Sequence, residues 1–81
     1  MKRLNEQKAL EVVEECPASR LSGMLIAARI ASVGGQKEGC VTSGGYKGYF
    51  KEVDGQAELY LITRTGEKLE DYLEAPSNTN I

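Results

Sequence analysis

The chain has 81 residues, of which 41% are hydrophobic and 27% are charged, and its formal net charge is −2. This size and composition are typical of one small soluble domain. The chain contains no histidine, so the commonest general base and metal ligand are missing, and we expect neither an enzyme nor a bound cofactor. No apolar run approaches the ~20 residues that span a membrane, and a charged helix rather than an apolar segment follows the basic start, so we expect no signal peptide and a cytoplasmic protein.

The two cysteines, Cys16 and Cys40, could form one disulfide bond. Two cysteines in a chain without a secretion signal more often stay reduced. Their spacing does not match the paired ligands of a zinc site, so we expect no metal.

The first expected element is a helix over residues 4–16, which Pro17 ends because proline disfavours helical backbone in the residue before it. Asn5 is its expected N-cap. The apolar residues at helical spacing form one stripe: Ala9, Leu10, Val13 and Cys16.

A second helix is expected over residues 21–33, with Ser19 as its cap. This segment is apolar on nearly every side and is interrupted only by Arg29, so we expect it to be mostly buried at the centre of the core. Gly34 and Gly35 then favour a left-handed C-terminal cap.

Residues 36–47 contain three glycines among small and polar residues, which disfavours a long helix. We expect a short helix or turn over residues 36–41, followed by a flexible glycine-rich connection. The alternative is a short strand at residues 40–42.

Asp54 and Gly55 separate two strand-like runs and predict a tight hairpin turn. A two-residue turn pairs Phe50 with Leu59 and Gly48 with Leu61 on one face, which should meet the helices. The opposite face then carries two other pairs: Tyr49 with Tyr60, and Lys51 with Glu58.

After the hairpin, Thr65 is expected to cap a last helix. Its apolar residues recur at i, i+3 and i+4: Leu69, Tyr72 and Leu73. Pro76 follows, and we expect residues 76–81 to form a disordered tail.

The run from Tyr60 to Gly66, YLITRTG, resembles the Tyr-x-Leu-Thr-x-x-Gly ending of the wing in winged-helix DNA-binding domains. Gly48-Tyr49-Phe50 resembles the start of the first wing strand. The resemblance implies one α+β domain over residues 1–75, ordered α-α-(short α or strand)-β-β-α. It further implies a recognition helix within residues 36–47, and inward-pointing side chains at Tyr60 and Ile62.

On this hypothesis the protein is a small transcriptional regulator that binds double-stranded DNA. Basic residues outnumber acidic ones between Cys16 and Lys51, although Asp54 at the wing tip would repel phosphate. The candidate DNA contacts are Arg20, Lys37, Thr42, Ser43, Lys47, Lys51 and Arg64.

The alternative hypothesis is a protein–protein interaction module, since winged-helix folds also bind proteins. A homodimer is one form that such an interaction could take. Basic residues gathered on one face would favour DNA, whereas scattered basic residues beside an apolar patch of Tyr49, Tyr60 and Ile62 would favour a protein. The candidate dimer or partner surface consists of Tyr49, Tyr60, Leu69, Tyr72 and Leu73.

Overall fold

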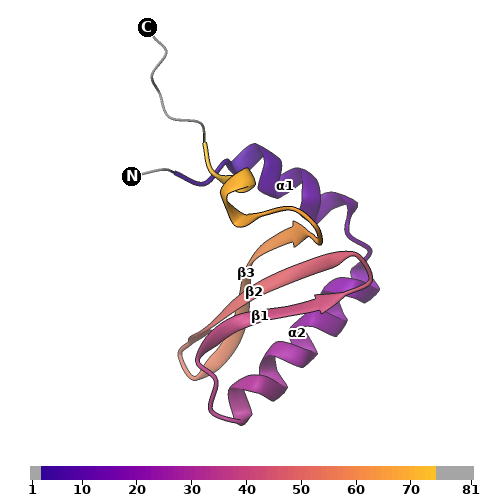
Figure 1. Cartoon of the computed structure of the whole chain (residues 1–81). Helices are drawn as coiled ribbons and strands as arrows, with labels where there is room; N and C mark the ends of the chain where they lie inside the picture. Colours follow the sequence, from indigo (N-terminus) through magenta and orange to yellow (C-terminus); the bar gives the residue numbers. More distant parts are fainter. Residues whose placement is uncertain (1–2, 75–81) are drawn as a thin grey trace, which may run out of the picture.

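Two helices precede a three-stranded antiparallel sheet in the computed structural model, which describes residues 3–74 (Figure 1). The sheet has the order β1-β2-β3, and the chain therefore has the expected α+β class. The expected tail at residues 76–81 lies outside the described residues. The elements are α1 (Glu6–Glu15), α2 (Ala18–Val33), β1 (Glu38–Ser43), β2 (Tyr46–Val53), β3 (Gln56–Arg64) and the short 3₁₀ helix η1 (Leu69–Tyr72).

Helix α1 begins after Asn5, whose side-chain oxygen accepts a hydrogen bond from the Lys8 N–H at 3.1 Å, so the expected N-cap is confirmed. The expected apolar stripe is only partly right. Val12 is fully buried and Cys16 nearly so, whereas Leu10 is 58% exposed and Val13 37% exposed. The reason is that α1 packs against β3 and η1 rather than across the whole sheet, so only one of its two apolar faces reaches the core.

Helix α2 runs along one face of the sheet and contacts all three strands (Figure 1). Met24 and Ala28 on its inner side are fully buried. The expectation that α2 is mostly buried was wrong, because only this inner side is covered within residues 3–74. Its outer side exposes large apolar residues: Ile26, Ile30 and Val33.

The two ends of α2 differ in how well the sequence predicted them. Pro17 occupies the N-cap position without a side-chain hydrogen bond, and Ser19 lies inside the first turn, so the expected Ser19 cap was wrong. At the other end Gly35 has φ of +104°, which confirms the left-handed C-terminal cap.

Residues 36–47 contain strand β1 and a tight turn, and no helix. The strand alternative is therefore confirmed, and β1 is longer than expected. Gly44 and Gly45, with φ of +50° and +93°, turn the chain from β1 into β2. The segment in which a winged helix has its recognition helix thus forms the edge of a sheet.

The β2–β3 turn has positive φ at Asp54 (54°) and Gly55 (81°), as a type I′ hairpin requires. The predicted pairs next to this turn, Phe50 with Leu59 and Lys51 with Glu58, are confirmed. A β-bulge follows and inserts Tyr60 as an extra residue.

Beyond the bulge the register differs from the prediction. Gly48 pairs with Ile62 instead of Leu61, and Tyr49 pairs with Leu61 instead of Tyr60. Ile62 is 3% exposed, as the winged-helix resemblance implied, but Tyr60 is 54% exposed and not inward-pointing. The bulge explains both results. After the extra residue Tyr60, the side chains of β3 that face the helices are the ones that a regular hairpin would place on the other face.

The core lies between the helices and the inner face of the sheet, and at Gly48 it leaves little room for a side chain. A Cβ atom at Gly48 would lie 3.0 Å from Leu59 Cδ2 and 3.1 Å from Met24 Sδ. Phe50, 1% exposed, fills the space beside Ala28. The inner face therefore carries Gly48 and Phe50, and the alternate residues of β2 face away from α2.

The expected last helix is only the single 3₁₀ turn η1. Gly66, with φ of +91°, turns the chain after β3, and the N-cap of η1 is Lys68, so the expected Thr65 cap was wrong. The Asn5 N–H donates to the Tyr72 carbonyl oxygen at 2.7 Å, and Leu4 forms a β-bridge with Leu73. This short segment therefore connects the two ends of the described chain.

Candidate functional site

One face of the sheet is not covered by α2, and its side chains come from all three strands. Along β1, exposed residues alternate with partly buried ones, and the exposed ones are register partners of outward residues of β2. This surface is called the open face below. Its exposed and half-buried residues are Glu38, Cys40, Thr42, Lys47, Tyr49, Lys51, Glu58 and Tyr60, whereas the β3 register partners of Tyr49 and Lys47, Leu61 and Thr63, are buried.

Two tyrosines and two lysines lie side by side at its centre. The ring centroids of Tyr49 and Tyr60 are 6.5 Å apart, with an interplanar angle of 54°. Lys47 Nζ lies 5.9 Å from the Tyr49 centroid, and Lys51 Nζ lies 5.4 Å from the Tyr60 centroid. Both distances are within the reach of a cation–π interaction. The expected neighbourhood of Tyr49 and Tyr60 thus exists, although their backbones are not register partners.

The two lysines have different electrostatic surroundings. Lys51 is the register partner of Glu38 on β1 and of Glu58 on β3, and Glu58 forms an ion pair with Arg29 at 3.6 Å. Lys47 has uncharged register partners, Thr42 and Thr63. The end of the open face around Lys47 is therefore its more positive part.

The other basic residues expected to contact DNA lie elsewhere. Lys37 pairs with Glu52 at 3.5 Å, and the Arg20 side chain lies against Gly44 in the β1–β2 turn. Ser43 is on the partly buried side of β1. Three of the expected contacts share the open face: Thr42, Lys47 and Lys51.

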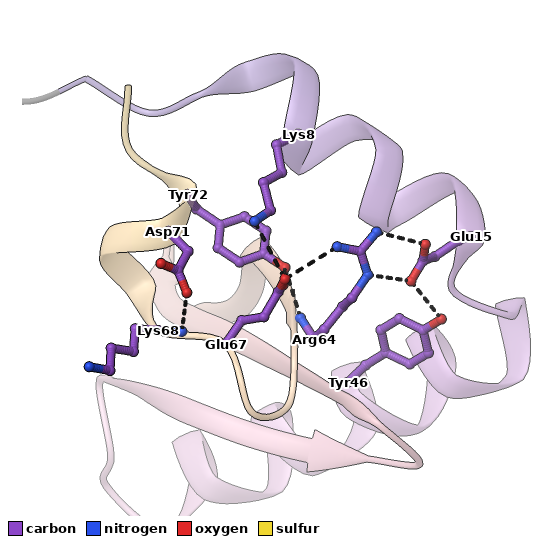
Figure 2. A network of polar contacts seen from close by, with 8 residues as sticks. All are labelled: Lys8, Glu15, Tyr46, Arg64, Glu67, Lys68, Asp71 and Tyr72. Carbon is purple, nitrogen blue, oxygen red and sulfur yellow. Dashed lines mark hydrogen bonds and ion pairs between the residues drawn. The ribbon is translucent and has the colours of Figure 1, made fainter. Parts of the chain in front are cut away.

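Arg64 belongs to a separate polar network that joins α1, β3 and η1 (Figure 2). Its guanidinium binds both carboxylate oxygens of Glu15, and its backbone N–H donates to the Tyr72 hydroxyl at 3.0 Å. The Tyr72 hydroxyl donates in turn to Glu67, which also pairs with Lys8. The network holds α1 against the end of the sheet, so we assign Arg64 a structural role.

The pKa directions in this network follow from its contacts. The hydrogen bond from Arg64 lowers the pKa of Glu15, and the one from Tyr72 lowers the pKa of Glu67. Burial, followed by the hydrogen bond to Glu67, raises the pKa of Tyr72. Each group is thus held in the charge state that its partners require at neutral pH.

The residues expected to form a partner surface do not form one patch. Tyr72 is fully buried and Ile62 is 3% exposed, so both belong to the core. Leu69 is 47% exposed and is the first residue of η1, whereas Tyr49 and Tyr60 lie on strands β2 and β3. The sequence reasoning missed Val12 as a core residue, and it missed that Leu10 remains outside the core. The sequence did contain a signal for this, because the residue at position 12, next to the predicted apolar stripe, is also apolar.

In comparisons with known proteins, no family model, curated protein or solved structure matches this chain. Within residues 3–74, no helix is long and apolar enough to cross a membrane. The same part of the chain brings together no cluster of three or more metal-binding side chains.

Proposed function

We propose that this protein binds single-stranded nucleic acid through the open face. Bases stack on Tyr49 and Tyr60, and Lys47 and Lys51 contact the neighbouring phosphates. The observation that carries the proposal is the tyrosine pair with a lysine over each ring, on a sheet face that α2 leaves uncovered. Aromatic side chains beside basic ones are the usual means of holding a single strand without sequence preference.

The geometry favours a single strand over duplex DNA, the partner first expected from the sequence. Residues 36–47 form a strand and a turn, so no helix is present there to enter a major groove. The tip of the β2–β3 hairpin carries Asp54, which would repel a phosphate. Stacking on the tyrosines of the open face needs unpaired bases, which a duplex does not offer.

The expected strength of binding follows from the number of contacts. Each base stacked on an aromatic ring contributes about 1–3 kcal/mol. Two phosphate contacts give a log–log salt slope of about −1.4 for a single strand, at roughly −0.7 per contact. Binding should therefore be weak, sensitive to salt and tolerant of base sequence.

The test is fluorescence anisotropy of a labelled oligothymidylate of about 10 nucleotides, a length within the usual site sizes, over a salt series. Lys47→Gln and Lys51→Gln should each make the slope shallower by about 0.7. Lys37→Gln is the matched control, because Lys37 is an exposed lysine away from the open face and should leave the slope unchanged.

Two results would contradict the proposal. One is the absence of binding at low salt. The other is an equal effect of Lys37→Gln and Lys47→Gln, which would indicate general charge attraction. A labelled duplex that binds more tightly than the single strand would instead support the duplex hypothesis.

A further inference from the structure

Strand β1 forms one edge of the sheet, because it pairs only with β2 (Figure 1). None of its six described residues is buried, and even those that face α2 are only half-buried. In the central strand β2, by contrast, the residues that face α2 include the buried Gly48 and Phe50. The described part of the chain therefore leaves the outer edge of β1 open.

The backbone of β1 carries hydrogen-bonding groups that point toward this open edge. The Glu52 N–H donates to the Lys37 carbonyl oxygen at 2.8 Å, directly before the first register pair of β1 and β2. Hydrogen-bonded pairs alternate along an antiparallel ladder, so every second residue after Lys37 directs its N–H and C=O toward β2 and the others direct theirs outward. The outward residues are Glu38, Cys40 and Thr42. No hydrogen bond within the described part of the chain reaches their backbone groups.

The opposite edge of the sheet, strand β3, is protected. Helix α1 packs against it, and a β-bulge interrupts its pairing with β2. The Arg64 N–H donates to the Tyr72 hydroxyl, and the Ala57 carbonyl oxygen accepts from Arg29 Nε at 3.3 Å. Covering elements, bulges, prolines and charges are the usual means of keeping an edge strand from pairing with another chain. The six described residues of β1 contain no proline and no bulge, and their one charged side chain is Glu38 at the first position.

An exposed apolar side chain lies on the flank of α2 nearest to β1. A Cβ atom at Gly23 would lie 3.9 Å from Ser43 Oγ, so this flank is next to the end of β1. Ile30 follows seven residues later on the same side of the helix and is 68% exposed. Helix α2 runs in the opposite direction to β1, and seven helical residues span about the length of three strand residues (Figure 1). Ile30 therefore lies at about the level of Cys40.

We infer that β1 pairs with β1 of a second copy of this chain, antiparallel and about a two-fold axis at Cys40. In this register Cys40 faces its counterpart, and Glu38 and Thr42 face each other across the interface. All the outward backbone groups then have partners, and no like charges are opposed. A shifted register would leave one of the three outward residues of each copy without an outward residue opposite.

A second copy fits this edge because the same axis serves both layers of the domain. A two-fold axis perpendicular to the sheet keeps both α2 helices on one side and both open faces on the other. It brings Ile30 of one copy toward Ile30 of the other, which removes apolar surface from water. The result is one sheet of six strands, three from each copy, with a continuous open face. The inference does not rest on nucleic-acid binding, and its test contains no nucleic acid.

The test is sedimentation equilibrium of the whole protein over a range of concentrations, which should show monomer and dimer. Cys40→Lys and Cys40→Glu should each raise the dissociation constant of the dimer about tenfold or more, because like charges then meet at the axis. An equimolar mixture of the two variants should dimerise again, because opposite charges then meet. Val53→Lys is the matched control, since Val53 is 42% exposed at the end of β2 and should leave the dissociation constant unchanged.

Two further measurements examine each layer of the interface. Ile30→Glu should weaken the dimer about tenfold or more, whereas Leu10→Glu, at a residue that is 58% exposed on α1, should not. Hydrogen exchange of the Cys40 amide should become slower as the protein concentration rises. The Val41 amide, which is directed toward β2, should be protected at every concentration.

The inference is wrong if the protein is a monomer at every concentration, or if the mixture of Cys40→Lys and Cys40→Glu does not dimerise again. It is also wrong if Leu10→Glu dissociates a dimer that Cys40→Lys leaves intact, because the copies would then meet at α1. Circular dichroism of each variant checks that the fold is retained.

Discussion

The Arg64 guanidinium binds the Glu15 carboxylate through two hydrogen bonds, from Nε to Oε2 and from Nη2 to Oε1, each 2.9 Å long (Figure 2). The Tyr46 hydroxyl donates to the same carboxylate at 3.1 Å. The pair joins the last turn of α1 to the end of β3. Arg64, one of the candidate DNA contacts predicted from the sequence, therefore stabilises the fold.

The first prediction concerns the dependence of stability on pH. The pKa values of Glu15 and Glu67 are lower in the folded protein than in the unfolded chain, where glutamate titrates near 4.3. Their contribution is therefore present above about pH 4.3 and is lost as the pH falls through the folded values. The urea concentration at the midpoint of unfolding should therefore decrease as the pH is lowered below about 4.3. This decrease should be smaller in Glu15→Gln than in the wild type.

The matched control for the acid prediction is Glu11→Gln, on the exposed side of α1. It should keep the wild-type urea midpoint at neutral pH, whereas Glu15→Gln should lower it. A wild-type midpoint that stays constant from neutral pH to about pH 3 would contradict a role of these carboxylates in stability.

The second prediction concerns the Tyr72 hydroxyl, which accepts from the Arg64 N–H at 3.0 Å and donates to Glu67. Tyr72 is fully buried, so Tyr72→Phe leaves a backbone donor without its partner. The expected loss is roughly 1–3 kcal/mol of unfolding free energy, measured with urea. Tyr60→Phe, at a ring that is 54% exposed, should cost much less. Equal costs would argue against the Tyr72 network.

The third prediction compares the same substitution at two glycines. At Gly48 an added methyl group would lie 3.0 Å from Leu59 Cδ2 and 3.1 Å from Met24 Sδ, so Gly48→Ala should destabilise by about 1–3 kcal/mol. At Gly23, inside α2, the nearest atom would be Ser43 Oγ at 3.9 Å. Gly23→Ala should stabilise by about 0.5–1 kcal/mol, because alanine favours helix. Thermal melts of both variants test the packing of α2 on the sheet, and the same sign for both would contradict it.

Three local signals in the sequence predicted the local structure correctly, whereas the expected Ser19 cap was wrong. The Asn5 cap, the Gly35 C-terminal cap and the Asp54–Gly55 turn depend on backbone preferences of neighbouring residues, so the sequence contains the information needed to find them. The bulge at Tyr60 could not be found in this way. It depends on which of Leu61 and Ile62 packs better against Met24 and its neighbours, and that is a property of the assembled core.

The candidate site was predicted in part, as pairs of residues rather than as one surface. Lys47 and Lys51 were expected to contact phosphate, and Tyr49 and Tyr60 were expected on the same sheet face. Their combination depends on the position of α2, which covers the opposite face. The role of Arg64 was not predictable, because its partner Glu15 is distant in the sequence and approaches only after α1 packs against β3.

The fourth prediction uses the two cysteines, both free in the structure. Cys16 is buried, and burial raises the pKa of its thiol, whereas Cys40 is exposed on the open face as the register partner of Tyr49. A thiol reagent should therefore modify Cys40 quickly and Cys16 only after unfolding. Oligothymidylate should slow the modification of Cys40. Mass spectrometry identifies the modified residue. If oligothymidylate does not slow the modification of Cys40, the nucleic acid binds away from β1.

The most direct test of the central claim is a map of amide chemical shifts in the protein as unlabelled oligothymidylate is added. The proposal predicts saturable changes at Cys40, Thr42, Lys47, Tyr49 and Tyr60. It predicts little change along the outer side of α2. Changes concentrated on α1, or none at low salt, would contradict binding of single-stranded nucleic acid by the open face.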